Sequence, residues 1–173
     1  MNADPTANAA AAKGADLSGQ YLTFVLGGET YAVDSSAVRE IIQYSSMTAV
    51  PLMPDFVRGV INLRGSVVPV IDLQARLGGS ITEFGKKTCI VIFDVPRDGE
   101  RVELGLMVDA VSEVIAVPGS HIEPPPQFGG GLRREFIRGM AKVGGRFVIL
   151  LETDKALDIE EMAALVAQAQ TDV

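Results

Sequence analysis

The pattern of apolar and polar positions predicts a chain of short β-strands. Residues 21–33, YLTFVLGGETYAV, are two apolar runs joined by a Gly-Gly-Glu-Thr turn, which is typical of a β-hairpin. A second tight turn is predicted at residues 96–99, PRDG. Apolar runs bounded by Gly, Pro or Asp predict further strands at residues 38–44, 66–73, 88–95, 101–109, 111–117 and 146–152. Strands this short and frequent favour closed barrels over one open sheet.

Helix is predicted in two places only. A short turn starts at residues 54–57, and Pro51 and Pro54 stiffen the approach to it. Much later, Asp158 precedes IEEMAALVAQAQ, and Glu161 follows at the spacing of a capping box. The apolar side chains of this segment share one helical face, at Ile159, Met162, Val166 and Ala169. We therefore expect a short terminal helix packed on a barrel.

The same pattern sets the expected domain organisation. Residues 1–17 lack both a basic start and a long apolar stretch, so we expect a flexible tail and not a signal peptide. Residues 18–157 should form one domain of two barrel lobes, followed by the helix and tail at residues 158–173. Residues 123–131, EPPPQFGGG, are expected to form a loop, because prolines lack donors and glycines lack side chains.

Two segments of the chain repeat in the same order. Residues 55–73, DFVRGVINLRGSVVPVIDL, recur 80 positions later as residues 135–153, EFIRGMAKVGGRFVILLET. Upstream of each copy, residues 33–42, VDSSAVREII, match residues 108–115, VDAVSEVI, if two serines are skipped. Such ordered similarity indicates a duplicated unit. Because a duplication preserves folding positions in both halves, polar residues present in one half only are the better candidates for function.

Composition excludes several classes of protein. The formal net charge of −7 repels a phosphate backbone, and the local basic cluster of Arg133, Arg134 and Arg138 is small, so nucleic acid is not expected as a partner. The apolar runs are far shorter than the roughly 20 residues of a membrane helix, so no membrane insertion is expected. One cysteine, Cys89, excludes an internal disulfide and agrees with a reducing compartment, and we expect a cytoplasmic protein.

No residue pattern supports catalysis, a metal or a cofactor. His121 is the single histidine and has no Ser or Cys nucleophile nearby in the sequence, so a solvated loop residue is favoured over a general base. Cys89 lies in the apolar run CIVIF, where core packing is the favoured role. The acids at strand ends are explained as Asx turns that satisfy the backbone, at Asp34, Asp72, Asp94 and Asp109. We therefore expect no enzyme.

Arg64 is the strongest candidate for a binding residue. It lies between Leu63 and Gly65 at a bend, in a surrounding of apolar residues, and the second copy has Gly144 at its place. An exposed guanidinium in an apolar rim can form paired hydrogen bonds with a partner and is a common interface anchor. The alternative is a solvated surface arginine. Asn62, beside it, has the alternative role of holding the turn through its own backbone.

The segment VREII adds a weaker candidate surface. Val38 and Ile41 cannot lie on the same face of a strand, so one apolar residue is expected to be exposed. Val38 with Glu40 is then predicted to form a contact surface. The alternative is a strand between two lobes that is buried on both faces.

These residues resemble a known family. GVINLRGSVVPVIDL, the hairpin FVLGGETYAVDSSAVREI and the later VDAVSEVI together are similar to the CheW family of bacterial chemotaxis coupling proteins, over about Ser18 to Val166. The most specific part is NLRG at Asn62–Gly65, followed by Pro69 and Asp72. The resemblance implies a mainly β fold of two intertwined five-stranded SH3-like β-barrels.

The resemblance also implies a function and partners. It implies a non-enzymatic adaptor that joins the cytoplasmic tips of methyl-accepting chemoreceptors to the regulatory domain of a CheA-type histidine kinase. Alone the chain is expected to be a monomer, and with its partners it joins receptor arrays at the membrane. The implied receptor-binding residues are Val38, Glu40, Gly59, Asn62, Arg64, Gly65, Ile90 and Val111.

Three alternatives remain at this stage. A small-molecule sensor would use the space between the barrels as a ligand pocket. A barrel hydrolase would depend on His121. Within the family, the same adaptor role in twitching or surface sensing differs in the receptor and not in the adaptor.

Overall fold

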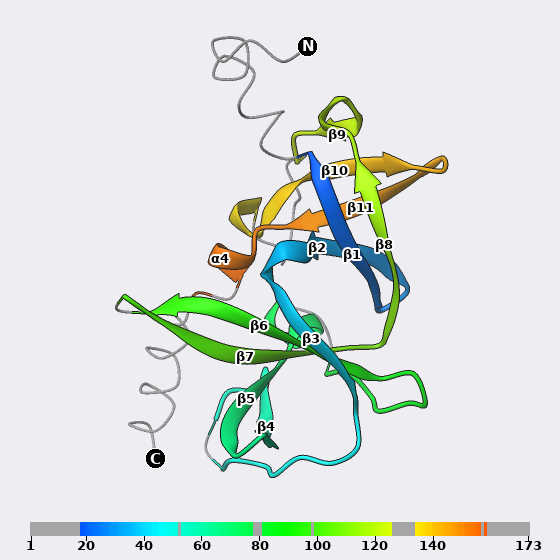
Figure 1. Ribbon diagram of the computed structural model, residues 1–173. Coiled ribbons are helices and arrows are strands. Elements are labelled where there is room, and N and C mark those ends of the chain that lie inside the picture. The colour runs from blue at the N-terminus through cyan, green and yellow to red at the C-terminus, as the bar shows by residue number, and fades with distance from the viewer. Residues whose placement is uncertain are drawn as a thin grey trace.

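The protein folds into two β-sheets, which we call the first and the second lobe (Figure 1). The computed structural model describes residues 18–51, 53–77, 81–97, 99–125, 134–156 and 158. The first lobe is a six-stranded sheet in the order β8-β1-β2-β11-β10-β9. Its strands are β1 (Gly19–Leu26), β2 (Glu29–Asp34), β8 (Ala110–Val117), β9 (Ile122–Glu123), β10 (Ile137–Val143) and β11 (Arg146–Leu151).

The second lobe is a five-stranded sheet in the order β3-β6-β7-β5-β4. Its strands are β3 (Val38–Gln43), β4 (Val57–Leu63), β5 (Ser66–Asp72), β6 (Cys89–Arg97) and β7 (Glu100–Val108). The helical segments are short turns at η1 (Ser35–Ala37), α3 (Leu73–Arg76), η2 (Gly119–His121), η3 (Arg134–Phe136) and α4 (Thr153–Ala156). The fold is therefore mainly β, as the sequence predicted.

The two lobes are intertwined because each repeat contributes strands to both of them. The N-terminal hairpin β1-β2 joins the lobe of the C-terminal strands, where β2 pairs in parallel with β11, and the blue and orange strands run side by side in Figure 1. The hairpin β6-β7 joins the lobe of β3, β4 and β5, where β7 pairs in parallel with β5. The duplicated unit thus exchanges its hairpins between lobes.

The matching VDSSAVREII and VDAVSEVI segments mark the two crossings between the lobes. The first contains the passage from β2 to β3, and the second contains the passage from β7 to β8. Each crossing begins with an aspartate that binds backbone, because Asp34 accepts a hydrogen bond from Ser36 N at 2.9 Å and Asp109 accepts one from Gly27 N at 2.9 Å. The predicted Asx turn is confirmed at Asp34, whereas Asp109 binds the distant turn between β1 and β2 instead of its own backbone.

The predicted closed, five-stranded barrels are only approximated. In the described residues both hydrogen-bonded sheets are open, and the first lobe has a sixth strand, because the 3-10 turn η2 separates β9 from β8. The edges of the second lobe are joined by a single bridge between Thr48 and Val60. Pro51 and Pro54, and Pro118 in the first lobe, lie in the segments between edge strands and donate no backbone hydrogen bond.

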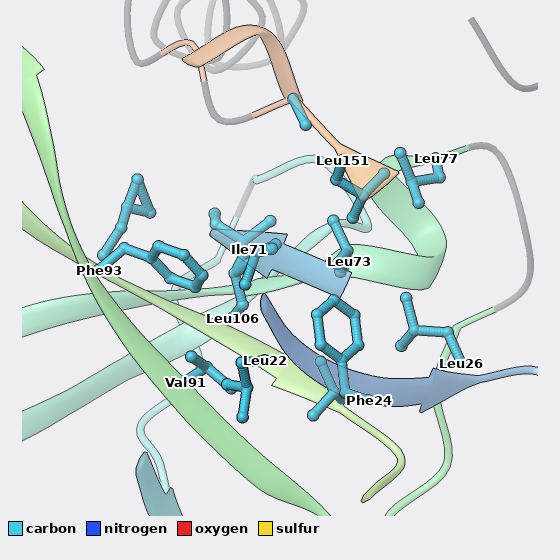
Figure 2. Packing of buried hydrophobic residues seen from close by; sticks show 14 of the residues in the cluster. Leu22, Phe24, Leu26, Ile71, Leu73, Leu77, Val91, Phe93, Leu106 and Leu151 are labelled. Carbon is cyan, nitrogen blue, oxygen red and sulfur yellow. The ribbon is translucent and has the colours of Figure 1, made fainter. Parts of the chain in front are cut away.

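Alternating side chains fill three separate clusters. Along β6, Ile90 and Ile92 enter the interior of the second lobe, while Val91 and Phe93 enter a larger cluster shared by both lobes. The first lobe has its own interior cluster, which includes Tyr21, Val148 and Leu150. Figure 2 shows the shared cluster, in which residues of β1 lie together with residues of β5, β6, β7, β11 and α3. Both faces of these strands are therefore buried.

Two predicted helical segments have different outcomes. The turn at residues 54–57 is confirmed, with Val57 N donating to Pro54 O at 2.9 Å. The expected terminal helix falls outside the described residues except for Asp158, which is not helical, and so do residues 1–17 and residues 126–131 of the predicted loop. The short helix α3, which was not predicted, is capped by Asp72, whose side chain accepts from Ala75 N.

Gly59 is required by packing between β4 and the chain that follows β3. The ladder between β4 and β5 shifts register between Val57 and Gly59. A Cβ atom at Gly59 would collide with the carbonyl oxygen of Thr48 and would lie 3.0 Å from Cγ of Met47. Gly59 thus allows the Thr48–Val60 bridge to form.

We predict that Gly59→Ala lowers the free energy of unfolding by about 1–3 kcal/mol, because backbone has to move to make room for the methyl group. Gly85→Ala is the matched control, since its nearest contact would be Thr88 Oγ1 at 3.9 Å and its φ is not left-handed. Urea unfolding of both variants measures the difference. Equal stability of the two variants would contradict the packing role.

Candidate functional site

The turn that carries Arg64 is a tight hairpin turn between β4 and β5. Arg64 has φ of +53° and Gly65 has φ of +86°, as in a type I′ turn. Asn62 Oδ1 accepts a hydrogen bond from Gly65 N at 3.0 Å. Asn62 therefore holds the turn, which is the alternative role considered for it, and the turn presents the Arg64 side chain at the surface.

The left-handed backbone of Arg64 is costly for a residue with a side chain. The second copy places Gly144 and Gly145 at the equivalent positions, with φ of +56° and +79°. A non-glycine residue in this conformation costs roughly 1–2 kcal/mol. Such backbone strain persists mainly where a side chain has a function. The strain at Arg64 is therefore independent support for its selection as a candidate.

Arg64 forms an ion pair with Glu40. Arg64 Nη2 lies 2.6 Å from Glu40 Oε1, and the two side chains are 70% and 27% exposed. Glu40 is on β3 and Arg64 follows β4, which are the two opposite edges of the second-lobe sheet. The ion pair thus links the two edge strands of the second lobe. The Thr48–Val60 bridge lies in the same lobe. Two of the predicted residues are brought together, and both remain accessible at the surface.

Apolar residues occupy equivalent positions of the repeat on β3, which carries Glu40, and on β8 of the first lobe. Val38 and Val111 are partly buried, and both pack against the shared cluster. Ile41 and Val114, which are also equivalent, are exposed large apolar residues. The prediction that Val38 would be the exposed residue of VREII is therefore wrong. Exposure alternates along β3, so Arg39, Ile41 and Gln43 face solvent, and Val38, Glu40 and Ile42 lie on the less exposed face.

Two predicted receptor-binding residues present no accessible side chain. Ile90 is 1% exposed and lies in the interior cluster of the second lobe, so it is unavailable to a partner. The sequence could not distinguish the two faces of CIVIF, because both faces of β6 are buried. Gly59 is buried and has the packing role described above.

Several exposed apolar residues of the described part of the chain were not identified as exposed by the sequence analysis, and two of them follow hairpin turns. Val67 on β5 and Phe147 on β11 are equivalent in the repeat, and both are exposed. Each is followed by a buried apolar residue of the same run, so the sequence did not distinguish it from a core residue. Their position immediately after the hairpin turns was the signal that could have identified them.

The equivalent arginine–acid pairs of the two copies stabilise the lobes. Arg58 Nη1 lies 2.9 Å from Oδ2 of the fully buried Asp72, and Arg138 Nε lies 3.4 Å from Glu152 Oε1. Burial opposes the charge of Arg138, but hydrogen bonds with Tyr21 and Glu152 outweigh it and raise the pKa of its guanidinium. Arg138 is thus committed to contacts within the protein and is not a free member of a basic cluster.

Asp34 completes the contacts of Arg138. Asp34 Oδ2 lies 3.6 Å from Arg138 Nη1. Partial burial raises the pKa of the Asp34 carboxyl, but hydrogen bonds from Ser36 and the charge of Arg138 outweigh this and lower it overall. The first crossing between the lobes is therefore held by a carboxylate that stays ionised in neutral solution.

The remaining polar candidates do not assemble into a catalytic or metal site. His121 lies with Ser120, Glu123 and Lys142 around a shallow depression of about 310 Å³. Cys89 is partly buried, packs against the shared cluster, and donates its thiol to Lys87 O at 3.3 Å. Within the described ranges, no three His, Cys, Asp or Glu side chains are grouped to hold a metal ion. None of the helices in that part of the chain is long and apolar enough to cross a membrane.

Comparisons with known proteins give a consistent result. The model of the CheW-like domain matches residues 20–161. The chemotaxis protein CheW of Klebsiella aerogenes is 37% identical over 144 residues, which cover 83% of this chain and 84% of that protein. The chemotaxis protein CheW of Rhizobium meliloti is 38% identical over 145 residues, which cover 84% of this chain and 91% of that protein.

A solved structure shows the same fold. The crystal structure of the scaffolding protein TtCheW from Thermoanaerobacter tengcongensis superposes with a TM-score of 0.69 at 35% identity, over 79% of this chain and 85% of that chain. The fold and these matches therefore define a CheW-like chemotaxis protein of the scaffolding class. The chain belongs to the CheW family. This confirms the resemblance found in the sequence.

We predict that Arg64→Gly changes the free energy of unfolding by less than about 1 kcal/mol, because relief of the left-handed backbone offsets loss of an exposed ion pair. Asp72→Ala is the contrasting variant, because it leaves Arg58 without its buried partner and should cost about 3 kcal/mol. Urea unfolding compares the two with the parent. A loss at Arg64→Gly as large as that at Asp72→Ala would mean that Arg64 is structural.

Proposed function

We propose that this protein is an adaptor that couples the cytoplasmic tips of chemoreceptors to the regulatory domain of a CheA-type histidine kinase. The observation that carries the proposal is Arg64, an exposed arginine held in a strained turn where the other half of the duplication has glycine. The family membership supports a scaffold role without chemistry of its own. The relatives are named as chemotaxis proteins, which favours chemotaxis over twitching or surface sensing.

The receptor-binding surface in this proposal centres on the Glu40–Arg64 pair. Gly65 and Asn62 shape the turn that presents Arg64. Apolar contacts come from β3 and β8 on either side of the junction between the lobes, at Val38, Ile41, Val111 and Val114. An arginine with an apolar surrounding suits a helical receptor tip that offers carboxylates and apolar side chains. Ile90 and Gly59 are left out because of their burial.

The kinase contact in this proposal uses the first lobe, away from the Arg64 turn. Phe147 on β11 is exposed beside the hairpin turn of β10 and β11, whereas its equivalent Val67 pairs with Asn62 and belongs to the receptor side. Exposed apolar residues at a strand near a sheet edge favour contact with another β domain. Phe147 is therefore the first position to substitute on the kinase side.

Coupling follows from simultaneous binding of two partners. When one surface binds the receptor and another binds the kinase, the adaptor fixes their relative geometry, so a receptor shift changes the kinase activity. Each contact can be weak, because avidity in an array supplies the remaining affinity.

The proposal includes location and domain boundaries. The adaptor works in the cytoplasm and reaches the membrane only through receptor arrays. In this proposal the CheW-like domain spans residues 18–157, with a tail before it and a helix and tail at residues 158–173; the family match to residues 20–161 supports most of that domain and extends past its end. A ligand-sensing function has less support, because the depression around His121 is shallow and lined by exposed side chains.

The experiment that tests the function is a reconstituted kinase assay. The CheA-type kinase of the same organism is mixed with a receptor cytoplasmic fragment, with and without this protein, and autophosphorylation is measured. Kinase activity that changes with the receptor only when this protein is present supports the adaptor role. Calorimetric titration against the kinase regulatory domain measures one contact alone. Failure of both assays with folded components would contradict the proposal.

We predict that Arg64→Glu leaves the fold intact and weakens receptor coupling by about tenfold or more, as expected for an interface anchor. Glu40→Arg should have a similar effect, since the pair at 2.6 Å becomes two like charges. The double variant Glu40→Arg with Arg64→Glu restores the pair in reverse and separates two causes. Recovery of receptor coupling in the double variant would mean that coupling requires only the ion pair. No recovery would mean that the Arg64 guanidinium itself contacts the receptor.

The control for this series is Arg101→Glu. Arg101 is on β7, is also exposed, and its Nη2 donates to the carbonyl oxygen of Asp94 at 2.9 Å. It therefore matches the charge change outside the proposed surface. Coupling by Arg64→Glu at the level of the parent would show that the anchor assignment is wrong.

A further inference from the structure

Arg76 is a nearly buried arginine at the contact between the two lobes. It is the last residue of α3, in the second lobe, and is 9% exposed. Its Nε donates to the carbonyl oxygen of Ala156, at the end of α4 in the first lobe, at 3.2 Å. A buried cation that donates to the other lobe is costly to desolvate, so its contacts have to compensate for that cost.

The guanidinium of Arg76 also contacts two aromatic rings from equivalent positions of the repeat. It lies 4.8 Å from the ring centroid of Phe136, which precedes β10, and 5.5 Å from that of Phe56, which precedes β4. Phe136 O accepts from Glu152 N at 2.7 Å, and Phe56 O accepts from Asp72 N at 2.6 Å. The backbone of each phenylalanine is thus bonded to the residue that precedes the helical turn of its lobe. Arg76 contacts both phenylalanine rings.

The contact breaks the symmetry of the duplication. Arg76 and Ala156 are themselves equivalent residues, because they lie 80 positions apart in register with the repeat. The arginine of one copy therefore binds the backbone of its own counterpart. The pairs Arg58–Asp72 and Arg138–Glu152 are kept in both copies, whereas the Arg76 contact exists in one direction only. By the argument from duplication, a residue present in one copy is a candidate for function.

Packing in the shared cluster and the two chain crossings restrict the angle between the lobes, and directional contacts at the junction restrict it further. Burial of apolar surface is favourable but non-directional, so it specifies an orientation less sharply than a directional contact does. A hydrogen bond is directional, and a guanidinium over an aromatic face also has a preferred geometry. Arg76 supplies both kinds of contact across the junction.

We propose that Arg76 is a positioning residue that sets the relative orientation of the two lobes. This inference rests on the proposed function in one respect, namely that the receptor-binding surface takes Val38 and Ile41 from the second lobe and Val111 and Val114 from the first. A change in the angle between the lobes changes the spacing between these two halves. Arg76 thus controls the shape of a binding surface that it does not touch.

The experiment measures the spacing between the lobes in the full-length protein without any partner. Spin labels are attached at Gln43→Cys on β3 and Ala116→Cys on β8, both exposed, in a Cys89→Ser background. The distance distribution between the labels is recorded by pulsed electron spin resonance. The parent should give one narrow distribution, and Arg76→Met should give a broader or shifted one. Arg76→Lys, which keeps the charge and a donor, should lie between them.

The control variant is Arg58→Met. Arg58 makes the same kinds of contact inside one lobe, with its guanidinium 4.7 Å from the Phe84 ring centroid and its Nη1 donating to Thr82 O at 2.8 Å. It should reduce stability without changing the distance between the labels. A folded Arg76→Met with the distribution of the parent would overturn the inference. If Arg76→Met does not fold, Arg76→Lys decides by the same criterion.

A second readout connects orientation to binding. Affinity for a receptor cytoplasmic fragment should fall about tenfold for Arg76→Met and recover in part for Arg76→Lys. Arg58→Met should bind as the parent does at temperatures where it is folded. If the parent itself does not bind the fragment, the proposed function fails, while the distance measurement still tests Arg76. Unchanged affinity with an altered distance distribution would show that Arg76 orients the lobes but does not control the binding surface.

Discussion

The exchange of hairpins between the two halves of the chain is the constraint on which the rest of the structure depends. Because β1-β2 completes the lobe of the C-terminal strands and β6-β7 completes the other, neither half can bury its strands alone. The strands therefore need apolar residues on both faces, one for the lobe interior and one for the shared cluster. The same exchange makes the chain cross between the lobes immediately before β3 and before β8, and β3 carries Glu40 together with the apolar residues next to it.

Much of this fold was predictable from the sequence because its signals are local. The hairpin turns, the Asx turn at Asp34 and the repeat all follow from short patterns of turn residues and apolar runs. What escaped prediction depends on distant contacts. The run CIVIF has no alternation, so nothing in it shows that Ile90 points inward. On β3 the alternation is regular, but which face is exposed is decided by the packing of Val38 against the shared cluster. Closure of the barrels was overestimated because prolines interrupt both connections.

The duplication also separates folding residues from functional ones in a way that a single sequence rarely allows. Residues kept in both copies have structural partners, as the two arginine–acid pairs and the two phenylalanines before β4 and β10 show. Differences between the copies identify Arg64, whose side chain is presented where glycine fits the backbone better. Comparison of the two copies did not identify the exposed residues Val67 and Phe147. Both positions are apolar, so they looked like folding positions, although only the residues that follow them are buried.

An adaptor without chemistry can act only through the geometry of its surfaces, and this requirement explains how the two arginines differ. Arg64 is exposed, pairs weakly with Glu40 in water, and is suited to exchange that pair for a partner. Arg76 is buried, contacts both lobes, and cannot reach a partner. Breaking an ion pair at the surface costs little free energy, whereas leaving a buried arginine without its contacts costs several kcal/mol, roughly 3–5. One arginine is therefore suited to making a reversible contact and the other to keeping the contact surfaces in a constant arrangement.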